Sequence, residues 1–83
     1  MATDSKSVQK AFGEALRQMR VSRGISQQEL ALESELDRTY ISLLERGLRQ
    51  PTITTLMGLS DALDIDPALL IKKTKARLDG NQN

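Results

Sequence analysis

The sequence contains no cysteine and no histidine, and it is poor in aromatic residues, with no tryptophan, one phenylalanine and one tyrosine. Without cysteine and histidine it can form neither a disulfide framework nor a zinc finger, and it has no cysteine or histidine nucleophile. It also lacks a glycine-rich phosphate loop and a pair of carboxylates in a recognisable pocket motif. These absences predict a protein that is not an enzyme and that needs no metal, cofactor or small-molecule ligand.

Long apolar stretches are missing as well. No run approaches the roughly 20 residues needed to span a bilayer, and the polar segment Met1–Lys10 lacks the apolar stretch of a signal peptide. We therefore expect a soluble, cytoplasmic protein. Its 83 residues provide for one domain with a single small core, which must be built from Leu, Ile, Ala and Met.

The charge of the chain is small but unevenly distributed. The net charge of +1 does not by itself indicate a nucleic-acid partner. Acidic residues cluster at 61–66, whereas the arginines lie mainly in the first 50 residues. These arginines are Arg17, Arg20, Arg23, Arg38, Arg46 and Arg49. Such a layout allows one face to be positive on a nearly neutral molecule.

Helical periodicity and capping residues predict two helices in the first half of the chain. The first runs over 8–23, with apolar residues at spacings of three and four, and Gly24 is in the position where a left-handed residue ends helices. Ser26 and Glu29 have the spacing of a capping box. A second helix is therefore expected over 27–34.

The same features predict three further helices and no strand. Asp37 is the N-cap of a third helix over 38–46, and Thr52 is the N-cap of a fourth. Asp66 followed by Pro67 starts a fifth, because proline is favoured at the first helical position. The fold class is thus a five-helix, all-α domain. Its expected boundaries are 8–79 for the domain and 1–7 and 80–83 for flexible ends.

The segment 26–47 has the pattern of two short helices packed at a steep angle across a tight turn. Leu30 and Ala31 fall on the inner face of the first of these helices, while Ile41 and Leu44 form the inner stripe of the second. The opposite face of the second helix carries polar side chains that no core requires. Because the major groove of DNA accepts one helix, these side chains can reach base edges. The predicted base contacts are Arg38, Thr39 and Ser42.

This block resembles the lambda-repressor-like family of helix-turn-helix domains, which includes the Cro and repressor proteins and is also called the XRE family. The resemblance covers about 12–70. Its most specific parts are Ser26-Gln27-Gln28-Glu29-Leu30-Ala31 and Leu44-Glu45-Arg46-Gly47, the latter followed by Pro51-Thr52. Within the family, the segment 36–42 is most similar to the controller proteins of restriction-modification systems.

Glu35 departs from the family pattern. The turn residue at this position is often Gly or Asn because it tends to adopt a left-handed conformation. We expect Glu35 to adopt that conformation too, at a cost of about 1 kcal/mol relative to glycine.

The resemblance also implies which residues contact the DNA backbone. In this family the residue at the position of Gln27 grips a phosphate with its side chain and backbone amide, assisted by the helix dipole. The loop after the recognition helix, which here carries Arg46, Arg49 and Gln50, runs along the backbone. Tyr40 is equally suited to reach a phosphate with its hydroxyl and to pack against the first helix, and we include it among the phosphate contacts. Glu45 is expected to pair with an arginine of the first helix.

A single recognition helix reads too few base pairs to find one site in a genome, so a dimer is expected. The candidate interface consists of apolar residues beyond the needs of the core: Ile53, Met57, Leu69, Leu70 and Ile71. In controller-like relatives the last helices form a two-fold interface. The sequence thus predicts a small homodimeric transcriptional regulator, of repressor or controller type, that binds a palindromic operator in double-stranded DNA. The alternative is an antitoxin-like interaction module that binds DNA together with a partner protein.

Overall fold

A computed structural model describes residues 4–80, and these form five α-helices and no strand. Their bounds are Ser5–Arg23 for α1, Gln27–Ser34 for α2, Arg38–Glu45 for α3, Ile53–Leu63 for α4 and Pro67–Gly80 for α5. The prediction of an all-α, five-helix domain is confirmed. None of the helices between residues 4 and 80 has the length and apolarity needed to cross a membrane.

The helix boundaries agree with the capping residues. Ser26 accepts a hydrogen bond from the backbone amide of Glu29, whose carboxylate accepts one from the amide of Ser26, so the capping box is present. Asp37 and Thr52 likewise cap α3 and α4. Gly24 ends α1 in a left-handed conformation with φ 76°.

Two boundaries differ from the expected ones. The first helix begins at Ser5 rather than Val8, because the carboxylate of Asp4 accepts a hydrogen bond from the amide of Lys6 and caps the helix one turn earlier. The third helix ends at Glu45, one residue before the expected end. Of the segments expected to be flexible, 1–3 and 81–83 lie outside the described residues.

The core is built almost entirely from aliphatic side chains of all five helices. It comprises Phe12, Ala15, Leu16, Leu30, Ala31, Ile41, Leu44, Leu56, Leu59, Leu63 and Leu70. The inclusion of Leu70 corrects an expectation, since this side chain is fully buried and cannot belong to the exposed patch predicted for dimerisation. Its position in the core follows from the docking of α5, which buries Leu70 and Thr74, one turn apart on the same face.

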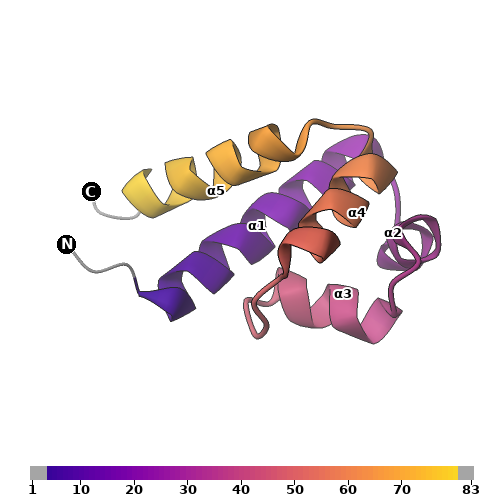
Figure 1. Ribbon diagram of the computed structural model, residues 1–83, viewed down its shortest axis with the longest axis horizontal. Coiled ribbons are helices and arrows are strands. Elements are labelled where there is room, and N and C mark those ends of the chain that lie inside the picture. Colours follow the sequence, from indigo (N-terminus) through magenta and orange to yellow (C-terminus); the bar gives the residue numbers. More distant parts are fainter. Residues whose placement is uncertain (1–3, 81–83) are drawn as a thin grey trace.

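Helix α1 is the element around which the others are arranged. In Figure 1 it runs through the middle of the molecule, with α5 along one side and α3 across the other, while α2 lies beyond the end of α1. Gly13 makes the close crossing of α1 and α3 possible. A Cβ atom at this position would collide with the backbone carbonyl oxygens of Leu44 and Glu45 at the end of α3. The end of α3 is therefore packed against the backbone of α1.

Glu35 adopts the left-handed conformation expected for it, with φ 58° and ψ 36°. Asp64 at the end of α4 is also left-handed, with φ 57°, which the sequence pattern did not predict. Both residues end a helix, where a left-handed residue lets its own amide donate to carbonyls of the last turn. Neither is glycine, so each carries a steric cost.

We predict that Glu35→Gly raises the free energy of unfolding by up to about 1 kcal/mol, because glycine removes the Cβ conflict while adding some flexibility to the unfolded chain. Urea denaturation followed by circular dichroism measures this change. Gly24→Ala is the control in the opposite direction. The Cβ atom of the new alanine would meet no atom within 4 Å, so the backbone strain at φ 76° is the only cost of the substitution in the folded state. It should destabilise the protein by about 1 kcal/mol. A lower urea midpoint for Glu35→Gly would contradict the prediction.

Candidate nucleic-acid interface

Helices α2 and α3 pack against each other and leave one face of α3 exposed to solvent. Leu30 and Ala31 on α2 are buried against Ile41 and Leu44 on α3, as their spacing predicted. Leu36 in the turn is half-buried and packs against the same core. The relative orientation of the two helices is therefore set by packing, and it leaves the outer face of α3 uncovered.

The three predicted base-reading residues differ in their exposure. Arg38 and Thr39 are exposed in the first turn of α3, whereas Ser42, one turn further along, is half-buried. Asp37 precedes them and accepts a hydrogen bond of 3.0 Å from the amide of Thr39. Its negative charge offsets the unfavourable position of the Arg38 cation at a helix N-terminus. The N-terminal end of α3, which would enter a groove first, thus carries a cation and a hydroxyl group.

A buried carboxylate joins α3 to the two helices before it. The side chain of Glu45 is only 3% exposed and accepts hydrogen bonds from Arg20 at both oxygens, with Nε to Oε2 at 2.6 Å and Nη2 to Oε1 at 3.0 Å. Gln27 donates from Nε2 to Oε1 of the same carboxylate at 3.0 Å. Arg20 further donates to the carbonyl oxygen of Ile25 at 2.9 Å. The expected pairing of Glu45 with an arginine of the first helix is confirmed.

The electrostatics of this cluster keep Arg20 charged. Hydrogen bonding to Glu45 raises the pKa of Arg20, and this effect outweighs burial, which acts in the opposite direction. The two charges neutralise each other, so the carboxylate does not oppose the approach of a phosphate to the first turn of α2. The contact between Glu45 and Gln27 was not predicted. It fixes the side chain of Gln27, the residue expected to grip a phosphate.

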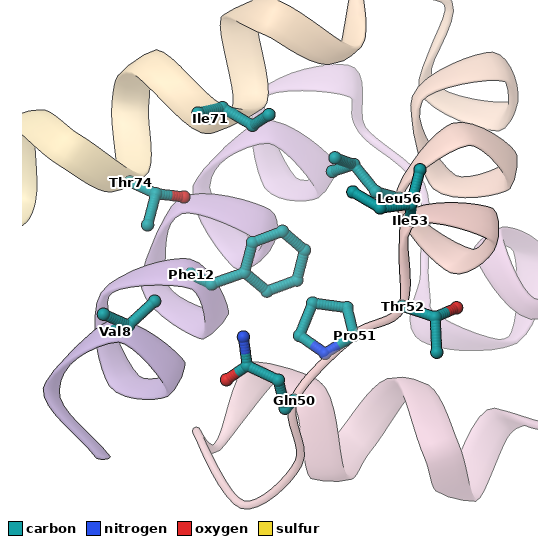
Figure 2. A pocket seen from close by; sticks show the side chains of 9 residues that line it. All are labelled: Val8, Phe12, Gln50, Pro51, Thr52, Ile53, Leu56, Ile71 and Thr74. Atoms are coloured by element: carbon teal, nitrogen blue, oxygen red, sulfur yellow. The ribbon is translucent and has the colours of Figure 1, made fainter. Parts of the chain in front are cut away.

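The remaining predicted phosphate contacts lie in different surroundings. Arg46 directly follows α3, and Arg49 lies in the loop beyond it; both are exposed, and Arg49 donates from Nη1 to the carbonyl oxygen of Leu48 at 2.9 Å. Tyr40 is half-buried, and its side chain packs against the core. Gln50 is exposed beside an apolar groove, where Figure 2 shows it between Val8 and Pro51.

The predicted dimer surface remains exposed apart from Leu70. Ile53 and Met57 on α4 are 67% and 48% exposed. Leu69 and Ile71 on α5 are 36% and 52% exposed. We call these four exposed apolar side chains of the last two helices the α4–α5 patch. Leu69 and Ile71, two residues apart, project to different sides of α5.

Two short helices packed across a tight turn, the second of which exposes an arginine and a hydroxyl side chain, are the arrangement of a helix-turn-helix DNA-binding domain. A profile of the helix-turn-helix family matches residues 16–70 of the chain. The protein belongs to the lambda-repressor-like, XRE-type helix-turn-helix family.

The relatives include controllers of restriction-modification systems. The chain is 38% identical over 71 residues to the control protein C.BamHI of Bacillus amyloliquefaciens, covering 84% of this chain and 88% of that protein. The crystal structure of the controller protein C.AhdI from Aeromonas hydrophila is similar with a TM-score of 0.74 and 42% identity, covering 75% of this chain and 94% of that one. The controller C.Esp1396I, solved as a tetramer in complex with its natural 35 base-pair operator, has a TM-score of 0.78 and 28% identity, covering 86% and 93%.

We predict that Glu45→Gln lowers the free energy of unfolding by about 3 kcal/mol, because it leaves the largely buried Arg20 without a charged partner. Chemical denaturation monitored by circular dichroism tests this. The matched control is Asp79→Asn, which breaks the exposed pair of Lys75 and Asp79, whose side chains are 69% and 58% exposed. That change should cost at most about 0.5 kcal/mol. Equal losses in the two variants would show that the Arg20–Glu45 pair contributes no more than a surface pair.

Proposed function

We propose that this protein is a homodimeric transcriptional regulator that reads a palindromic operator with α3 in the major groove. The observation that carries the proposal is the uncovered outer face of α3, on which Arg38 and Thr39 are exposed while the inner face is locked into the core. A packed core has no need of these side chains in this position. Such a regulator acts in the cytoplasm, where its operator is accessible.

Base reading and backbone contact are assigned to different residues. The guanidinium of Arg38 can donate two hydrogen bonds to O6 and N7 of guanine, while Thr39 and Ser42 offer hydroxyls and a methyl group to neighbouring bases. Arg46 and Arg49 lie beyond the other end of α3, where they suit phosphates rather than bases. Gln27 approaches a phosphate at the N-terminus of α2, where the helix dipole is favourable.

Dimerisation provides the second half of the recognition surface. The α4–α5 patch is exposed and apolar in the monomer, and a two-fold axis would set it against its own copy. The two recognition helices would then lie about 34 Å apart, one turn of DNA, and match an operator with two half-sites. C.Esp1396I, a relative of similar fold, was solved as a tetramer in complex with its natural 35 base-pair operator, which supports DNA binding by an assembly of several copies.

The first prediction from this function is a strong dependence of DNA affinity on salt. Arg46 and Arg49 from two copies would displace about four condensed counterions, so log Kd against log salt should have a slope of about 3 to 4 or steeper. Fluorescence anisotropy with a labelled duplex of the region upstream of the gene measures this, with a shuffled duplex as the control. Absence of binding to any duplex at low salt would refute DNA binding as the function.

The second prediction separates base reading from backbone contact. Arg38→Ala should reduce discrimination between operator and shuffled DNA by about 1 to 3 kcal/mol per half-site and leave binding to shuffled DNA nearly unchanged. Arg46→Ala should weaken binding to both duplexes by a similar factor, and it should lower the salt slope by about one for each arginine–phosphate pair that the substitution removes. Equal weakening of operator and shuffled binding in both variants would contradict the division of roles.

A further inference from the structure

A glycine lets the loop that follows α3 lie directly on α1. Gly47 has φ 73°, and a Cβ atom on it would lie only 2.8 Å from the Cα of Lys10 and 3.4 Å from the carbonyl oxygen of Gln9. A left-handed residue in such a close backbone contact is best accommodated as glycine. The loop stays beside α1 further along, because Gln50 and Val8 line the same groove (Figure 2). The fold therefore joins this loop to the N-terminal half of α1.

The two segments that meet at this junction carry cations and no acidic residue. The part of α1 up to Gly13 includes Lys6 and Lys10, and the loop before α4 includes Arg46 and Arg49. All four cations are exposed, and none forms an ion pair with another residue between positions 4 and 80. The junction thus has a local excess of positive charge on a chain whose net charge is only +1.

The acidic residues that border the two segments already have partners. Asp4, the N-cap of α1, accepts two hydrogen bonds from the first turn of its own helix. Glu14 pairs with Arg77 of α5 at 3.5 Å. The carboxylate of Glu45 is buried and paired with Arg20. The positive charge of the junction is therefore not neutralised by these carboxylates.

We propose that Lys10 contacts the DNA backbone together with Arg46 and Arg49, so that the phosphate-binding surface extends from the loop onto α1. This inference rests on the proposed function and adds a second structural element to it. A row of phosphates is the partner with matching chemistry, because it presents negative charges at regular intervals along one line. The ammonium group of a lysine, on its flexible stem, suits such a contact, which needs less exact geometry than the reading of a base.

A purely structural role for Lys10 would also have a physical basis. A Cβ atom at Gly13, three residues after Lys10, would collide with the carbonyl oxygens of Leu44 and Glu45, so the C-terminal end of α3 lies close by. The helix dipole stabilises a cation at such an end. This role predicts that removing the charge lowers the free energy of unfolding and leaves the salt dependence of DNA binding unchanged. The salt dependence therefore separates the two roles.

The test is the salt dependence of DNA binding by Lys10→Gln, measured by fluorescence anisotropy with the labelled upstream duplex and its shuffled counterpart. The loss of one phosphate contact from each copy of the homodimer should reduce the slope of log Kd against log salt by about 2. Affinity for both duplexes should fall by a similar factor, because a backbone contact carries no sequence information. Lys10→Arg keeps the charge and should retain the wild-type slope.

Lys72→Gln is the matched control. Lys72 is an exposed lysine near the start of α5, and among the described residues it forms no ion pair. Figure 1 shows α5 beginning near the C-terminal end of α1, whereas Lys10 is in its N-terminal half. Both substitutions remove one positive charge and introduce a residue of high helix propensity. The control should have the wild-type slope, and circular dichroism and sedimentation equilibrium verify the helix content and oligomeric state of all variants.

The outcomes separate this inference from the proposed function. A wild type that binds no duplex at low salt overturns both. If the wild type binds and Lys10→Gln has the same slope, DNA binding stands and the phosphate contact of Lys10 is refuted, whatever happens to the urea midpoint. An equal decrease of the slope in Lys72→Gln would show an effect of net charge alone and would also overturn the proposal. So would a loss of affinity for the operator with unchanged binding to shuffled DNA, which is the behaviour of a base contact.

Discussion

The buried carboxylate of Glu45 is the constraint on which the placement of the recognition helix depends. It lies at the last residue of α3, accepts two hydrogen bonds from Arg20 of α1 and one from Gln27 of α2, and is nearly inaccessible to water. Aliphatic packing alone is tolerant of small rotations, whereas three directional hydrogen bonds to a buried charge are not. The missing side chain of Gly13 completes the constraint, because it lets the last carbonyls of α3 approach the backbone of α1.

The same cluster explains how a chain with a net charge of +1 can present a surface suited to DNA. The charge of Glu45 is matched by Arg20 within the protein, and Arg23 donates to the carbonyl oxygen of Leu63, at the end of α4. These two arginines of α1 therefore serve the fold. Arg38, Arg46 and Arg49 flank α3 at its two ends, so three cations lie beside the helix that is proposed to enter the groove.

Local chemistry was sufficient to predict the helices but not all of their contacts. Caps such as Ser26 and Asp37 act on neighbouring amides, so their spacing in the sequence specifies a helix start directly. The sequence did not indicate which residue of the run Leu69-Leu70-Ile71 is buried. The other buried residue of α5 is the polar Thr74, one turn after Leu70, and it interrupts the apolar pattern that would have marked this face. Thr74 tolerates burial by donating its hydroxyl to the carbonyl oxygen of Leu70 at 2.9 Å. Arg20 lies two turns from Gly13 on the same side of α1, a spacing that would have identified it as the partner of Glu45 once the crossing with α3 was known.

Helix α1 connects the two surfaces that the proposed function requires. One side of α1 crosses α3 at Gly13. Another side packs against α5, and Phe12 of α1 lines the apolar groove. A half-site spacing is defined only if the recognition helix and the surface that joins two copies are fixed relative to each other. In the proposed homodimer α1 provides that link, because it packs against both α3 and α5.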